Sequence, residues 1–337
     1  MRNTELIALI FSLLQVTAGS VQSRDVNKYL LFNEFLSIEE VTILITDSGL
    51  GGIAVCADIE SRFRSEHPFK SVKIIYCNAL PESDYGYNNM KTTEEKVRVF
   101  SAALDGMTKW YSPDIILIAC NTLSVLYEQT DYFLNAKIPV ISIVDIGVDM
   151  MTDALKKDTT SSIVIFGTET TIEARSHQSL LLKNGITEDR IVTQACPDLA
   201  GEIQSDASSD AVATMIGFYS DDAAKKLPAV SGNVYVGLCC THFGYASEHF
   251  LQGVNDASKR KTFVIDPTRS MSGVIFPVKS NKRFVSTTVS VNVVSRAAIT
   301  QQETRSIGAL IMGQSAVTAN SLQKYTLKKD LFEFQRK

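Results

Sequence analysis

The chain has 337 residues, of which 45% are hydrophobic and 21% are charged, with a mean hydropathy of +0.05. This composition is typical of a globular protein and excludes a mainly disordered or collagen-like chain. The 33 Lys and Arg against 37 Asp and Glu residues give a net charge of −4, which argues against nucleic acid as a partner. Six cysteines are too few for a disulfide scaffold, so each is judged by its position.

The first residues have the layout of a secretory signal peptide. An apolar run at 6–14 follows Arg2, and small residues at 16–18 offer a cleavage point. The run is too short for a membrane span, which needs roughly 20 apolar residues. We therefore predict a signal peptide at 1–22 and a periplasmic or secreted protein with no membrane span after its removal. An ordinary N-terminal helix and a cytoplasmic location are the alternative.

Strand-like and helix-like segments alternate along the next part of the chain. Continuous apolar runs, typical of strands buried on both faces of a parallel sheet, occur at 41–46, 72–77, 114–119 and 140–144. Helices are expected at 53–63 and at 93–111, the second ending before Pro113. This pattern predicts an α/β unit with a parallel sheet.

A second series of alternating strand-like and helix-like segments begins after residue 144. Apolar runs at 162–166, 190–193 and 233–238 follow the same order, and Cys120 and Cys240 end corresponding strands 120 positions apart. We interpret this as an internal duplication.

The predicted fold class is therefore α/β, with two pseudo-symmetric parallel-sheet domains and the active site in the crevice between them. The first domain is expected to comprise 38–144 plus about 265–337, and the second 145–264. Ligands of such sheets bind beyond the carboxyl ends of the strands. Asp47 and Thr168 stand at such strand ends, as do Cys120 and Cys240.

Gly49–Ala54 matches the pattern G-x-G-x-x-G/A of dinucleotide-binding loops. Those loops also require an acidic residue at the end of the second strand, where this chain has Cys77 and Asn78. The absence argues against a nucleotide. A tight turn that needs glycine, or backbone N–H groups that hold a small carboxylate beside Asp47, fits better.

Two cysteines differ from the other four. Cys56, Cys77 and Cys196 are expected to be small buried hydrophobes, and Cys239 to point into the sheet packing. Cys120 and Cys240 are each followed by small polar residues, Asn121-Thr122 and Thr241-His242.

Two thiols that face each other across a crevice can invert a stereocentre. One thiolate removes a proton from carbon while the other thiol returns a proton to the opposite face. Asp47 and His242 are placed to assist them. A disulfide between Cys120 and Cys240, a metal site from Cys239, Cys240 and His242, and a Cys240–His242 nucleophile for acyl transfer are the alternatives. The metal site lacks the usual ligand spacing, and we expect none.

Six motifs along residues 41–270 appear in the order and spacing of one family: Asp47-Ser48-Gly49-Leu50-Gly51-Gly52, Tyr85-Gly86, Ala119-Cys120-Asn121-Thr122, Gly167-Thr168-Glu169-Thr170-Thr171, Ala195-Cys196-Pro197 and Cys240-Thr241-His242. The chain resembles the glutamate racemases of the cofactor-independent aspartate/glutamate racemase superfamily.

This resemblance implies an isomerase that interconverts L- and D-glutamate without pyridoxal phosphate or metal, as a homodimer, to supply peptidoglycan and cell-wall synthesis. It implies that Cys120 and Cys240 are the acid–base pair and that Asp47 and His242 assist them. It also implies a set of residues that hold the amino and carboxylate groups: Ser48, Tyr85, Gly86, Asn121, Thr122, Thr168, Thr171 and Thr241.

Several positions depart from the family pattern. Asp84 stands where proline is common, and a carboxylate facing the pocket would repel the side chain of glutamate. Phe243-Gly244 replaces Tyr-Pro, and Gln204, with Glu202 nearby, stands where a glutamate is expected. A racemase of another small amino acid or carboxylic acid such as aspartate, and a catalytically inactive solute-binding relative, therefore remain alternatives. The segment 323–337 is expected to form a solvated helix face.

Overall fold

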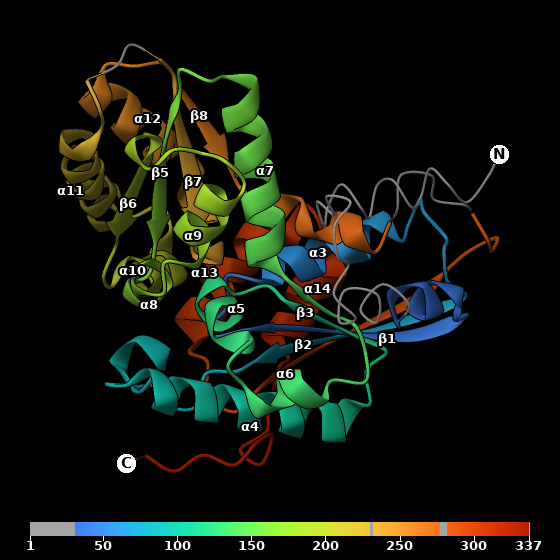
Figure 1. The fold of residues 1–337 in the computed structure, drawn as a ribbon. Helices are drawn as coiled ribbons and strands as arrows, with labels where there is room; N and C mark the ends of the chain where they lie inside the picture. Colours follow the sequence, from blue (N-terminus) through green and yellow to red (C-terminus); the bar gives the residue numbers. More distant parts are fainter. Residues whose placement is uncertain (1–30, 230–231, 277–281, 337) are drawn as a thin grey trace.

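The computed structural model describes residues 31–229, 232–276 and 282–336, and each of the seven apolar runs predicted as strands between residues 41 and 238 forms a parallel strand. The first lobe has a six-stranded sheet in the order β10-β9-β2-β1-β3-β4. Its strands are β1 Glu40–Asp47, β2 Ser71–Asn78, β3 Ile115–Ile118, β4 Val140–Ser142, β9 Thr288–Ser295 and β10 Thr326–Leu327. Figure 1 labels three of these strands, β1, β2 and β3. This sheet is buried on both faces, because Leu44 belongs to one apolar core while Ile43 and Ile45 belong to the other.

The second lobe repeats this plan in a smaller sheet. Its strands are β5 Ser162–Gly167, β6 Ile191–Ala195, β7 Val234–Cys239 and β8 Thr262–Ile265. They are ordered β6-β5-β7-β8, which matches β2-β1-β3-β4 in the first lobe. The predicted fold class of two pseudo-symmetric parallel-sheet α/β units is therefore confirmed.

Helices cover both sheets and join the lobes. They are α3 Ile53–Arg62, α4 Thr93–Tyr111, α5 Asn121–Tyr127, α6 Asp131–Asn135, α7 Ile143–Lys157, α8 Glu169–Glu173, α9 Ser176–Lys183, α10 Leu199–Asp206, α11 Asp210–Lys226, α12 Ser247–Ser258, α13 Gln301–Met312 and α14 Ala316–Gln323. Helix α7 leads from the first lobe into the second, and α13 packs against α10 of the second lobe (Figure 1).

Local chemistry fixes the ends of the long helix α4. The Thr92 hydroxyl accepts a hydrogen bond from the backbone N–H of Glu95, which caps the amino end. Glu94 and Glu95 lie in the first turn, where acidic side chains favour the helix dipole. Ser112 adopts a left-handed conformation with φ 43° at the other end, before Pro113. The predicted bounds of this helix are confirmed.

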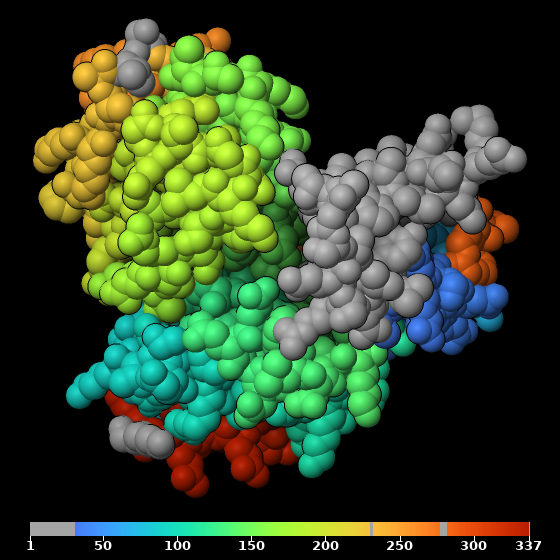
Figure 2. Space-filling model, in the orientation of Figure 1, coloured from blue at the N-terminus to red at the C-terminus, as the bar shows by residue number. Residues whose placement is uncertain are grey.

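The predicted helix at 323–337 is wrong. Helix α14 ends at Gln323, and the chain then forms the short strand β10 and a segment without helix. Leu331 and Phe332 are buried in the core beneath α4, close to Gly106. The burial of these two apolar side chains, rather than the mixed-charge pattern of the segment, determines its conformation. In Figure 2 the red surface of these last residues lies under the cyan surface of α4.

Within the described residues, no helix combines the length and the apolar character that crossing a membrane would need. The predicted signal peptide at 1–22 lies outside them.

Burial of His177 makes the stability of the fold depend on pH. Burial lowers the pKa of this histidine to about 4, below its ordinary value of about 6.5. Between these values the unfolded chain binds a proton that the folded chain does not bind. The free energy of unfolding is therefore highest above pH 6.5 and falls as pH drops toward 4, by about 3 kcal/mol in all from this group.

We expect His177→Gln to reduce this loss while its amide still reaches Asn121. Urea unfolding at several pH values between 7 and 4 measures the slope. His249→Gln, at an exposed position, is the matched control. Equal slopes for His177→Gln and wild type would show that another group causes the acid instability.

Candidate active site

A cavity of about 270 Å³ opens at the carboxyl ends of the strands and takes its walls from both lobes. Ten predicted residues line it: Asp47, Ser48, Gly86, Cys120, Asn121, Thr122, Thr168, Cys240, Thr241 and His242. The motifs of the two lobes, far apart in sequence, therefore meet at one place.

Cys120 lies at the end of β3, where it precedes the first residue of α5. Its Sγ is 3.2 Å from the Ser48 hydroxyl, and the backbone N–H of Leu123 is also directed at it. Burial, and then the negative charge of Asp47, raise the pKa of this thiol to about 12, against the opposing effect of these hydrogen bonds. The thiol is therefore protonated at neutral pH.

Cys240 occupies the corresponding place at the end of β7. It lies in the core of the second lobe and on the wall of the cavity, whereas Cys239 points into a different core, as predicted. Its Sγ is 3.8 Å from Nδ1 of His242. Burial, followed by the nearby Cys120, raises the pKa of the Cys240 thiol well above its ordinary value. Burial lowers the pKa of His242, so this imidazole is neutral and can act as a proton acceptor.

Asp47 connects the two lobes at the floor of the site. Its Oδ2 accepts a hydrogen bond of 2.7 Å from the backbone N–H of Gly52 and another of 2.7 Å from the hydroxyl of Thr241. The side chain is 1% exposed. A buried carboxylate needs such partners, and here one of them belongs to the opposite lobe.

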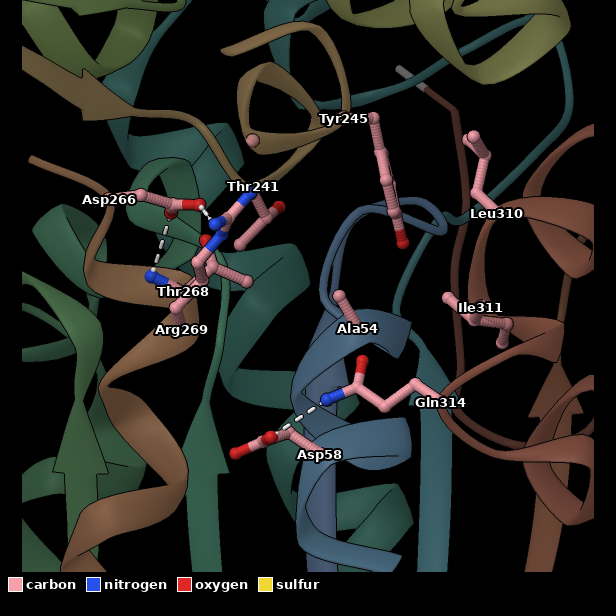
Figure 3. Close-up of a pocket in the computed structure, with 11 residues that line it drawn as sticks. Ala54, Asp58, Thr241, Tyr245, Asp266, Thr268, Arg269, Leu310, Ile311 and Gln314 are labelled. Atoms are coloured by element: carbon pink, nitrogen blue, oxygen red, sulfur yellow. Dashed lines mark hydrogen bonds and ion pairs between the residues drawn. The ribbon is translucent and has the colours of Figure 1, made fainter. Parts of the chain in front are cut away.

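Glycines in the 47–52 turn make room for the second lobe. A Cβ on Gly51 would lie 2.7 Å from the backbone nitrogen and 2.7 Å from Nδ1 of His242, and would also strike the Thr241 hydroxyl. The glycine loop therefore fits against Thr241-His242. Thr241 also lines a second cavity of about 380 Å³, whose walls include Asp266, Tyr245 and Leu310 (Figure 3).

Asn121 carries a polar atom that lacks a partner. His177 Nε2 lies 3.1 Å from Asn121 Oδ1, which ties α5 to α9. Nδ2 of Asn121 is buried and has no hydrogen bond within the described part of the chain. An unsatisfied buried donor is costly unless a ligand completes it. Because Asn121 lines the cavity, this donor is suited to an oxygen of a bound molecule.

Three threonine hydroxyls form a cluster between the lobes. Thr122 Oγ1 is 2.8 Å from Thr168 Oγ1, which is in turn 3.0 Å from Thr171 Oγ1. Thr122 and Thr168 line the cavity, whereas Thr171 supports them from behind. Thr168 also caps α8, since its hydroxyl accepts from the backbone N–H of Thr171.

Tyr85 does not line the cavity. Its hydroxyl donates to the carboxylate of Glu95 at 3.2 Å, and the guanidinium of Arg336 lies 4.3 Å from its ring centre. Asp84 is also turned away from the cavity, because it is exposed and pairs with Arg336 at 3.0 Å. The departure at Asp84 therefore places no charge against a bound substrate.

Among the residues of the cavity wall that were not assigned a role from the sequence, two form a chain of hydrogen bonds to His242. Gln204 of α10 lies 2.9 Å from Nε2 of His242, and Glu303 of α13 accepts a hydrogen bond of 2.5 Å from Gln204. Gln204 stands after the Cys-Pro motif and could be noticed there, whereas no sequence signal marks Glu303. Glu202 is exposed.

All six cysteines are free thiols. In the described residues, no group of three or more His, Cys, Asp or Glu side chains is arranged to hold a metal ion.

Several curated glutamate racemases are similar to this chain. The enzyme of Sulfurihydrogenibium sp. is 30% identical over 200 residues, which span 59% of this chain and 70% of the relative. The chain belongs to the glutamate racemase family. The glutamate racemase of Aquifex aeolicus is 27% identical over 72% of this chain and 82% of its own length. The match to that of Aquifex pyrophilus, at 30% identity, spans 54% of the relative. No family model matches the chain.

Solved glutamate racemases share the fold. The enzyme of Campylobacter jejuni aligns with a TM-score of 0.58 and 20% identity over 80% of this chain and 98% of its own. The enzyme of Francisella tularensis, solved with D-glutamate, aligns with a TM-score of 0.61 and 18% identity over 81% and 94%. The two-lobed architecture is therefore that of the glutamate racemase family.

The close fit at Gly51 makes a testable prediction. We expect Gly51→Ala to displace Thr241 and His242 and to lower kcat of the catalysed reaction by roughly 100-fold, because small displacements of reacting groups are costly. Turnover and thermal stability are measured together. Gly217→Ala, which adds the same atom into open space, is the control. Wild-type turnover by Gly51→Ala would mean that the loop contact does not position the site.

Proposed function

We propose that the protein interconverts L- and D-glutamate by proton transfer at the α-carbon, with Cys120 and Cys240 as the two acid–base groups. One observation carries this proposal: two thiols, from corresponding strand ends of two related lobes, line the same cavity. Membership of the glutamate racemase family supports the choice of substrate.

In the proposed step the thiolate of one cysteine takes the α-proton, and the electron pair of the broken C–H bond remains on the substrate. The thiol of the other cysteine then donates its proton to the opposite face of that carbon. The reverse reaction exchanges the two roles. The products carry the same atoms as the substrate, so the step needs no oxidant or reductant.

Both thiols are protonated before the reaction because burial raises the pKa of each. One of them must therefore lose its proton after the substrate binds. Nδ1 of the neutral His242 lies 3.8 Å from Cys240 Sγ and is placed to accept that proton. On the other side, the Ser48 hydroxyl and the N–H of Leu123 can stabilise a thiolate at Cys120.

Neutral donors are proposed to bind the carboxylates of the substrate. Among the described residues that line the cavity, none is Lys or Arg. Asn121 offers its unpaired Nδ2, and Thr122, Thr168 and Thr241 offer hydroxyls. Asp47 supplies a negative charge toward which an ammonium group would be drawn. Use of the product in peptidoglycan synthesis, a homodimer and export are parts of the proposal that rest on the sequence alone.

Incubation of the reduced protein with each enantiomer of glutamate in D₂O tests the proposal. We expect the α-proton NMR signal to disappear from both enantiomers while the opposite enantiomer accumulates. Aspartate and other amino acids are run in parallel. If the α-proton of another amino acid exchanges and that of glutamate does not, the other amino acid is the substrate. Tight binding of an amino acid without α-proton exchange would indicate a solute-binding protein.

The two cysteines can be tested separately. We expect Cys120→Ser and Cys240→Ser each to reduce racemisation by at least 1,000-fold with the fold intact, since a hydroxyl ionises far less readily than a thiol. Chiral chromatography measures the product, and circular dichroism checks the fold. Cys56→Ser, buried away from the cavity, should keep turnover. Wild-type turnover by either catalytic variant would contradict a two-thiol mechanism.

Asn121→Asp tests the unpaired donor. The substitution keeps an acceptor for His177 and replaces the Nδ2 donor with a second acceptor oxygen, which repels a carboxylate. We expect KM for glutamate to rise by at least about tenfold, in line with a lost hydrogen bond to a charged group. Initial rates over a range of concentrations give KM and kcat. An unchanged KM would show that Asn121 does not touch the substrate.

A further inference from the structure

Glu303 reaches the cavity from helix α13, and both of its carboxylate oxygens accept hydrogen bonds. Oε1 accepts the hydrogen bond from Gln204 Nε2 at 2.5 Å. Oε2 accepts from the backbone N–H and from the hydroxyl of Thr300, both at 2.8 Å, and so completes the capping box of α13. A carboxylate is suited to this place because it accepts hydrogen bonds on both oxygens.

The Glu303 contact fixes the orientation of the Gln204 amide. A carboxylate accepts hydrogen bonds, so the group that faces it must be the NH₂ of Gln204. Its Oε1 then faces the other way, where the backbone N–H of Leu50 donates to it at 2.8 Å. The opposite orientation would set two donors against each other at Leu50. Both neighbours therefore require the same orientation.

The orientation of Gln204 in turn fixes the tautomer of His242. Nε2 of His242 lies 2.9 Å from the same Oε1, which is an acceptor, so Nε2 must carry the hydrogen. In a neutral imidazole the other nitrogen, Nδ1, then holds a lone pair. That nitrogen is the one beside the Sγ of Cys240.

We propose that Glu303 is a positioning residue that, through Gln204, holds His242 in the Nε2–H tautomer, with the Nδ1 lone pair directed at Cys240. This inference rests on the proposed function, because it assigns the group that takes the thiol proton. The step is a transfer of the Cys240 proton to Nδ1, which leaves a thiolate and an imidazolium. The other tautomer presents an N–H to the sulfur and cannot accept this proton.

Glu303→Gln separates this role from helix capping. Glutamine has nearly the same size and also serves at this position of a capping box. It has one acceptor oxygen, so when that oxygen binds Thr300, its NH₂ faces Gln204. The Gln204 side-chain amide must then rotate by about 180° so that its oxygen accepts from the new NH₂ group. Its own NH₂ group then faces the backbone N–H of Leu50 and Nε2 of His242. We expect His242 to leave the Nε2–H tautomer and kcat to fall roughly 10- to 100-fold.

The tautomer is read from the ¹⁵N NMR shifts of the His242 ring in the substrate-free protein, assigned by comparison with His242→Gln. This signal does not depend on which substrate the protein uses. Glu202→Gln, exposed and two residues from Gln204, makes the same change of charge and is the matched control. It should leave both the ring shifts and kcat unchanged.

Exchanging the two side chains gives the decisive variant. In Gln204→Glu/Glu303→Gln, a carboxylate faces His242 and Leu50, and the amide at 303 donates to it while its oxygen caps α13. We expect the double variant to restore the Nε2–H tautomer and most of the kcat that Glu303→Gln loses. Identical His242 shifts in Glu303→Gln and wild type would overturn the proposal. So would an altered tautomer with unchanged kcat, or a double variant no better than Glu303→Gln alone.

The two proposals can fail independently. If wild type does not racemise glutamate but Glu303→Gln still changes the His242 tautomer, the proposed substrate is wrong and the positioning chain is retained. The kcat comparison is then repeated with the amino acid that exchanges in D₂O. If wild type racemises glutamate and the ring shifts do not change, the positioning role of Glu303 is wrong and the proposed function is unaffected.

Discussion

The hydrogen bond from the Thr241 hydroxyl to the buried carboxylate of Asp47 joins the strand ends of the two lobes. Around it, Gly51 lies so close to Thr241-His242 that no side chain fits between them. Cys120 belongs to the lobe of Asp47, and Cys240 immediately precedes Thr241 in the other. The separation of the two thiols therefore depends on this junction. Proton transfer to opposite faces of one carbon tolerates little displacement, so a rigid junction serves the proposed chemistry.

Burial disfavours the charged forms of the two thiols and of His242, and the hydrogen bonds of the site can stabilise those forms. Removing the thiols from water raises the pKa of both, and removing His242 from water lowers its pKa. All three groups are therefore neutral, and the charges needed for catalysis must be made by moving protons within the cavity. Burial of these side chains strengthens each hydrogen bond that stabilises those charges. The same burial makes the unpaired donor at Asn121 Nδ2 costly until a bound carboxylate accepts a hydrogen bond from it.

The sequence predicted those features that depend on local patterns. Continuous apolar runs identified the strands, and their restart after residue 144 identified the two related lobes. Strand-end positions identified Cys120, Cys240 and Asp47. Contacts between distant segments were not predictable: Gln204 and Glu303 are 99 positions apart, and neither residue type implies the other. Tyr85 matched a family motif, yet Glu95 and Arg336 hold it outside the cavity. The buried Phe332 likewise contradicted a charge pattern that had indicated solvent.

The order of elements along the chain explains how Glu303 can act on the second lobe. The chain builds β1–β4, crosses through α7 to build β5–β8, and then returns to add β9 and β10 to the first sheet. Helix α13 lies on this return path, so it belongs to the first lobe in its packing and reaches α10 of the second lobe. While the two lobes are in contact, the carboxylate of Glu303 on this helix can therefore orient the amide of Gln204 on the opposite lobe. Separation of the lobes would break the Gln204–Glu303 hydrogen bond together with that between Asp47 and Thr241. The tautomer of His242 and the spacing of the thiols would then be lost at the same moment, which ties the protonation of the site to the closed arrangement of the lobes.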